Sequence, residues 1–100
     1  MLPNCIGLDK DGISFDEAKQ LEQKIIKEQK CQVILYKTKR GFHLILIYNT
    51  NISRDKNFAV RKKYGDCKER IRRSLLRPDD VPYDILFSIK DGHWRKRILF

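Results

Sequence analysis

Helical periodicity is clearest in the polar-rich segment that follows the first dozen residues. Its apolar side chains recur every three or four positions, as one face of a helix requires. Ser14 and Glu17 form an S-x-x-E capping box, in which each side chain accepts a hydrogen bond from the other residue's backbone amide. We therefore predict a helix that begins at Ser14, with an apolar face made of Phe15, Ala18, Leu21, Ile25 and Ile26.

Five short runs of apolar residues predict strands. Asp9–Gly12 follows the first run as a tight loop, Lys39–Gly41 makes a hairpin turn, and Asp79–Pro82 is a further loop. Asp91–Gly92 is a dipeptide typical of type I′ hairpins. The predicted strands are Asn4–Leu8, Cys31–Thr38, Phe42–Tyr48, Asp84–Lys90 and His93–Phe100.

Two consecutive helices are predicted between the third and fourth of these strands. The first covers residues 53–64, begins at a serine cap and is stopped by Gly65. The second covers residues 66–77, begins at Asp66 with Glu69 in the capping-box position, and ends before a proline.

The predicted order is therefore β-α-β-β-α-β-β, in which the helical pair counts as one α unit. Two β-α-β halves of this kind predict a single α+β domain over residues 1–100, of the ferredoxin-like or RRM-like sandwich type. Such a domain has an antiparallel sheet with its helices on one face, and its first strand lies between the third and the fourth. The other face of the sheet is open and available for function.

Candidate chemistry lies on that open face, because successive side chains of a strand point to opposite sides. If the larger apolar sets face the helices, Asp9, His43 and Asp84 share the open face and Asp11 lies just past the strand end. Such a set could hold a divalent metal ion and a triphosphate. The structural alternative makes the aspartates turn or strand-start residues and the histidine a satisfied residue at an edge or interface.

Charge separates the two halves of the chain. Lys and Arg outnumber Asp and Glu by 22 to 13, and residues 51–100 hold 14 of the basic residues against 7 acidic ones. This surplus predicts a polyanionic partner, most simply nucleic acid, whereas the alternative is a solvated surface rich in Lys, Arg and Glu. The predicted phosphate-binding residues are Lys39, Arg40, Arg61, Lys62, Lys63, Arg70, Arg72, Arg73, Arg77, Arg95 and Arg97.

Hydrophobic side chains on the open face suggest two further uses of it. Ile45, Ile47 and Leu86 would favour a homodimer in which a second copy covers the face. Aromatic rings could instead stack on bases, although in so small a protein they usually belong to the core. The aromatic candidates are Tyr36, Tyr48, Tyr83 and Trp94.

The three cysteines and the absence of a long apolar run bear on the compartment. The cysteines are far apart and show no metal-ligand spacing, so we expect buried free thiols in a reducing cytoplasm. No run approaches the roughly 18 apolar residues that a membrane span needs. We therefore expect a cytoplasmic protein with no membrane partner, in a host cytoplasm if it is viral.

Several short motifs occur in the order found in one group of enzymes. Asp9-Lys10-Asp11 stands after a strand and before a helix, as a D-x-D metal motif would. Thr38–His43 looks like a small-residue–Gly–aromatic–His segment, and residues 64–77 are similar to a G-D-D-x-x-R-[IL]-x-x-D-x-x-R segment. Together they resemble the catalytic core of the archaeo-eukaryotic primase superfamily, especially small archaeal or viral proteins related to it. The resemblance covers most of the chain.

The resemblance implies both a fold and a site. It implies an RRM-like core in which Asp9, Asp11 and Asp84 hold Mg²⁺ or Mn²⁺ and His43 approaches the nucleotide phosphates as a catalytic residue.

The chain also departs from the pattern of that superfamily. Cys67 and Ser74 stand where acidic residues are expected. We therefore expect a nucleic-acid-binding protein that resembles a minimal primase-type core without full polymerase activity. The alternatives are an active metal-dependent nucleotidyltransferase and a structural or dimerisation module.

Overall fold

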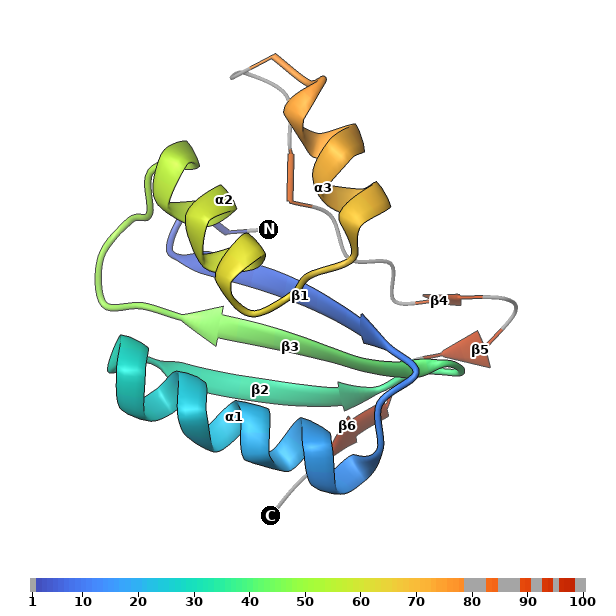
Figure 1. Cartoon of the computed structure of the whole chain (residues 1–100). Helices are drawn as coiled ribbons and strands as arrows, with labels where there is room; N and C mark the ends of the chain where they lie inside the picture. Colours follow the sequence, from blue (N-terminus) through green and yellow to red (C-terminus); the bar gives the residue numbers. More distant parts are fainter. Residues whose placement is uncertain (1, 79–82, 85–88, 91–92, 95, 99–100) are drawn as a thin grey trace.

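An antiparallel sheet of four strands forms the centre of the molecule, in the order β1-β3-β2-β6 (Figure 1). The computed structural model describes residues 2–78, 83–84, 89–90, 93–94 and 96–98. Together with three helices, the sheet confirms the predicted α+β class. The strands are β1 (Cys5–Asp11), β2 (Gln32–Lys37), β3 (Gly41–Ile47) and β6 (Lys96–Ile98).

Two helices cover one face of the sheet, and a third lies beyond its edge. α1 (Phe15–Gln29) and α2 (Arg54–Lys63) lie on the same side, whereas α3 (Lys68–Leu75) stands beyond β1 and beside α2 (Figure 1). The predicted capping box is present, because the Ser14 hydroxyl accepts from the Glu17 amide and the Glu17 carboxylate accepts from the Ser14 amide. Within the described part of the chain, no helix combines the length and the apolar composition that a membrane crossing needs.

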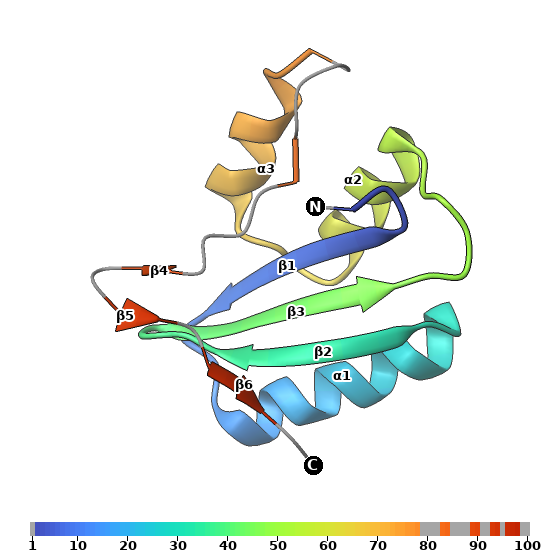
Figure 2. The same ribbon diagram turned by 180° about the vertical axis from the view of Figure 1, so that it is seen from behind.

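The core confirms the predicted alternation along the strands. It lies between the sheet and the two covering helices, so the opposite face of the sheet is turned toward the viewer in Figure 2. On β3 the residues between the core members are His43, Ile45 and Ile47, which belong to that opposite face. The core members are Ile6, Leu8, Ala18, Ile25, Cys31, Leu35, Phe42, Leu44, Leu46, Tyr48, Val60 and Tyr64.

β1 is longer than predicted and includes the segment that we expected to be a loop. It pairs with β3 as far as Asp11, which lies opposite Gly41, so Asp9 and Lys10 are strand residues. A side chain at residue 41 could not fit there, since its Cβ would lie 2.0 Å from the Lys10 carbonyl oxygen. Glycine therefore permits this close approach of β1 and β3. The polar sequence of residues 9–12 is typical of a loop, so it did not indicate the extended conformation of residues 9–11.

The predicted limits of α2 are confirmed, but the predicted start of the next helix is wrong. Ser53 caps α2 and Gly65, with φ of +69°, follows its end. α3 begins after Cys67, which makes no side-chain cap. Asp66 cannot cap it because its carboxylate accepts hydrogen bonds from the Asp9 amide and from two arginines. The capping box that we expected between this residue and residue 69 is therefore absent.

The C-terminal strands only partly follow the prediction. β4 (Ile89–Lys90) pairs with β5 (His93–Trp94) as a separate hairpin, and β6 pairs with β2. The described parts of the last predicted strand are β5 and β6, and among the described residues no strand pairs with the outer edge of β1. The ferredoxin-like strand order is not confirmed. The predicted loop at 79–82, the turn residues 91–92 and most of the predicted fourth strand lie outside the described residues.

Candidate nucleic-acid interface

A row of four side chains crosses the sheet face that is turned away from α1 and α2. Asp9 is paired with His43, His43 with Tyr36, and Tyr36 with Arg97, each directly across neighbouring strands. Directly opposed residues of antiparallel strands point to the same face. The row therefore lies on the face away from α1 and α2, which confirms the expected position of His43 beside Asp9.

The histidine of this row is buried. His43 is only 1% exposed, and its Nε2 lies 3.5 Å from the Asp9 Oδ1. The side chains at the other end of the row are more accessible, since Tyr36 is half-buried and Arg97 is exposed. The predicted contact between His43 and a phosphate stays a prediction.

The three predicted metal ligands do not come together. Asp11 is exposed at the end of β1, two residues beyond Asp9. Asp84 is buried at the outer edge of β1, where its carboxylate accepts hydrogen bonds from the Gly7 amide at 2.8 Å, from Asn57 at 2.8 Å and from Arg70. Among the described residues, no three His, Cys, Asp or Glu side chains are grouped to hold a metal ion. This donor set does not fit Mg²⁺ or Mn²⁺.

A buried ionic network takes the place of the predicted metal site. Asp66 accepts from the Arg61 Nε and from the Arg70 Nη1, each at 2.7 Å, and from the Asp9 amide at 2.8 Å. Arg70 also contacts the Gly7 carbonyl and Asp84. Side chains thus bond the outward backbone groups of β1 that a further strand would otherwise pair with.

This network corrects two of the predicted phosphate-binding residues. Arg61 is fully buried, and it also donates to Asn57 and Ser74. The Arg70 side chain is 12% exposed and holds two carboxylates. Neither guanidinium is therefore available to a polyanion. The signal that we missed was the four-residue spacing between residues 57 and 61, which share one face of α2, and between residues 66 and 70, which lie just before and within α3.

Most of the other predicted phosphate-binding residues are on the surface. Arg72 and Arg73 are exposed and both bind Glu69, and the hydrogen bond from Arg72 lowers the pKa of that carboxyl. Arg77 is half-buried, and Arg95 lies outside the described residues. The remaining exposed ones are Lys39, Arg40, Lys62, Lys63 and Arg97.

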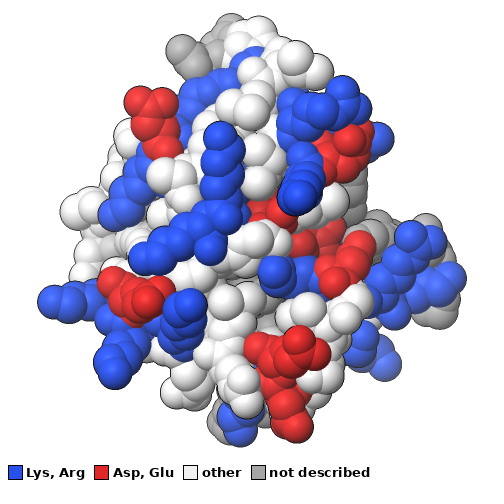
Figure 3. Space-filling model, in the orientation of Figure 1, with Lys and Arg blue, Asp and Glu red and all other residues white. Residues whose placement is uncertain are grey.

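The described surface keeps the basic excess of the composition, although charged side chains of both signs are withdrawn from it. Among the residues whose side chains are described, fifteen exposed Lys and Arg face six exposed Asp and Glu. Figure 3 shows both signs interspersed over the helix side of the molecule, with a group of Lys and Arg side chains at the hairpin end of the sheet. The buried acidic residues are Glu22, Asp66 and Asp84.

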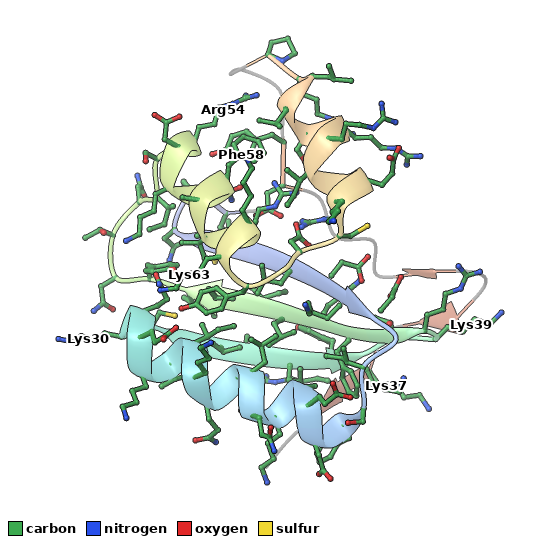
Figure 4. All side chains as sticks on the ribbon, viewed as in Figure 1. Lys30, Lys37, Lys39, Arg54, Phe58 and Lys63 are labelled. Carbon is green, nitrogen blue, oxygen red and sulfur yellow. The ribbon has the colours of Figure 1, made fainter. Side chains whose placement is uncertain are left out.

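One end of the sheet gathers basic residues that are distant in the sequence. β6 pairs with β2 so that Lys96 lies opposite Lys37 and Arg97 lies opposite Tyr36. The β2–β3 turn beside them adds further basic side chains, of which Lys39 points away from the body of the molecule (Figure 4). We call this edge of the sheet the basic corner. It consists of the exposed residues Lys37, Lys39, Arg40, Lys96 and Arg97. Lys37 and Lys96 point to the helix side of the sheet, and Arg97 points to the other side.

The aromatic candidates have different environments. Tyr48 belongs to the core. Tyr83 packs against Phe58 with ring centroids 5.6 Å apart, and the Arg54 guanidinium lies 5.0 Å from the Tyr83 ring. The Trp94 side chain lies outside the described part, so Tyr36 is the described candidate that stands on the open face.

Comparison of the chain with protein-family models, with curated proteins and with solved structures gave no match.

Proposed function

We propose that this protein binds nucleic acid through the basic corner. The observation that carries the proposal is the pairing of β6 with β2, which joins the basic residues at 96–97 to those at 37–40. Like charges directly opposed across two strands, such as Lys37 and Lys96, destabilise a sheet in isolation. A polyanion bound over them would remove that repulsion and would gain several phosphate contacts at once.

The size of the electrostatic contribution follows from the number of cations. Each Lys or Arg that neutralises a phosphate releases a condensed counterion and makes the affinity depend on salt. The logarithm of the binding constant then falls against the logarithm of the salt concentration with a slope of about −0.7 per contact for single strands and about −0.9 for duplexes. Full use of the five cations predicts a slope of about −3.5 to −4.5.

The proposal is for binding without full polymerase activity. Phosphoryl transfer of the primase type would need carboxylates that are free to hold divalent metal. The Asp84 carboxylate is instead bound to Arg70, Asn57 and a backbone amide. We keep the primase-type resemblance and the RRM-like architecture in this proposal. They account for the sheet surface that would bind nucleic acid, and we assign no catalytic role to them.

A charge-reversal experiment with a matched control tests the proposal. Lys39→Glu/Arg40→Glu changes two exposed residues of the basic corner, and Lys24→Glu/Lys27→Glu makes the same change in net charge on the C-terminal half of α1. Binding of a fluorescent 12-nucleotide strand and of a 12-bp duplex would be followed by anisotropy over a range of salt concentrations.

The two variants are expected to behave differently. The basic-corner variant should weaken binding and reduce the magnitude of the salt slope by about 1.4 to 1.8, because two contacts are lost. The α1 variant should keep the wild-type slope. Equal slopes for the two variants, or no binding by the wild-type protein at low salt, would contradict the proposal.

A further inference from the structure

Tyr36 occupies a distinctive place beside the basic corner. It lies on the sheet face away from α1 and α2, directly opposite Arg97 across β2 and β6, whereas the next pair, Lys37 and Lys96, points to the other face. On its other side Tyr36 is paired with His43. The ring is half-buried, so part of it reaches the surface next to an exposed guanidinium.

This combination of groups matches the chemistry of an unpaired nucleotide. A tyrosine ring offers a π-face on which any base can stack, and Arg97, the paired cation on the same face, can hold a phosphate beside that base. Directly opposed residues in antiparallel strands have Cβ atoms about 5 Å apart, which places Arg97 within reach of a nucleotide stacked on Tyr36. A base in a duplex is covered above and below by its neighbours and cannot use such a ring.

We infer that the ligand of the basic corner is single-stranded nucleic acid and that Tyr36 stacks on one of its bases. This inference rests on the proposed nucleic-acid binding and adds the ligand class and the residue that selects it. The phosphate contacts are shared by single and double strands, whereas the stacking contact is available only to an unpaired base.

The test separates stacking from charge by using two strands with the same backbone. A thymidine 12-mer and an abasic 12-mer carry the same phosphates, but only the first has bases. The wild-type protein should bind the thymidine strand about 5- to 150-fold more tightly, which corresponds to the stacking of one base on an aromatic ring. Tyr36→Leu keeps a bulky apolar residue in the strand and should remove most of that ratio, and Tyr36→Phe should restore it.

Each outcome decides a separate claim. A wild-type ratio near one, with salt-dependent binding of both strands, would overturn the stacking inference and leave the proposed function standing. A large ratio that persists in Tyr36→Leu would show that another residue stacks and would also overturn it. Binding of a 12-bp duplex with no binding of either strand would overturn the inference and leave the proposed function standing. Failure to bind the strands and the duplex would refute the proposed function itself. Far-UV circular dichroism and thermal melting of each variant confirm that the comparison is made between folded proteins.

Discussion

Replacing Asp66 with asparagine tests whether the buried ionic network holds α2, α3 and β1 together. Asp66 is 3% exposed and its carboxylate accepts from two guanidinium groups and from the Asp9 amide. Asparagine keeps the shape and one acceptor oxygen, but it places an NH₂ donor where the Arg61 Nε and Arg70 Nη1 donate. The charge of Arg61, which is fully buried, then has only the neutral acceptors Asn57 and Ser74 among its described partners.

The expected loss of stability is large for a protein of this length. Removing one partner of a buried ion pair costs about 3–5 kcal/mol, because the remaining charge stays buried without compensation. Domains of this size have a free energy of unfolding of about 5–15 kcal/mol. The Asp66→Asn substitution should therefore remove about a fifth or more of the stability and lower the melting temperature by about 12–40 °C.

Glu69→Gln is the matched control for this substitution. Glu69 also binds two arginines, Arg72 and Arg73, but its side chain is 47% exposed and water can replace the lost contacts. Urea denaturation followed by circular dichroism would give the midpoint and the slope for each variant. The midpoint of Glu69→Gln should stay close to that of the wild-type protein. If the two variants lost the same stability, burial would not be the cause and the reasoning would be refuted.

Three further predictions concern a strand contact, a buried acid and a thiol. Gly41→Ala should lower the free energy of unfolding, measured by urea denaturation, by about 3 kcal/mol, because the new Cβ would lie 2.0 Å from the Lys10 carbonyl oxygen. Gly12→Ala should lower it by about 1–2 kcal/mol, because residue 12 has a φ of +74° but open space around it. Burial raises the pKa of Glu22, so stability falls as the pH rises through the folded-state pKa, and Glu22→Gln should be more stable than the wild-type protein at pH 7 but not below about pH 4. Cys67 should be the first thiol to react with a colorimetric thiol reagent, because it is half-buried and the other two are buried with raised pKa values.

Each of these predictions has an outcome that would contradict it. Equal losses for the two glycine variants would mean that the backbone clash is relieved without cost. A Glu22→Gln variant whose stability tracks the wild-type protein at all pH values would mean that burial does not perturb this carboxyl. Simultaneous reaction of all three thiols in the folded protein would mean that the two buried cysteines are accessible.

Much of the fold follows from local patterns in the sequence. The capping box at Ser14, the glycine after α2 and the alternation along β3 were each readable within a few residues, and each is confirmed. The same alternation located His43 on the open face. These features depend on backbone geometry and on neighbours in the sequence, so spacing alone is enough to predict them.

Other features could not be predicted because their partners are distant in the sequence. Asp84 has the composition of a metal ligand, yet its position 77 residues after Gly7 brings it to a backbone amide and to Arg70. Charge counts cannot separate a buried arginine such as Arg61 from an exposed one such as Arg72, since each belongs to a basic run. Only the packing of α2 and α3 against β1 assigns them to different environments.

The sequence by itself determined an α+β class with a basic surplus and a histidine on the side of the sheet away from the helices. Its periodicities and caps act over distances of one helical turn or one pair of strand residues. The tertiary structure alone decided which charges neutralise each other inside and which remain outside. It also decided that β6 lies beside β2, which assembles the basic corner from two segments nearly 60 residues apart. Long-range pairing depends on the packing of the whole chain, and no local spacing encodes it.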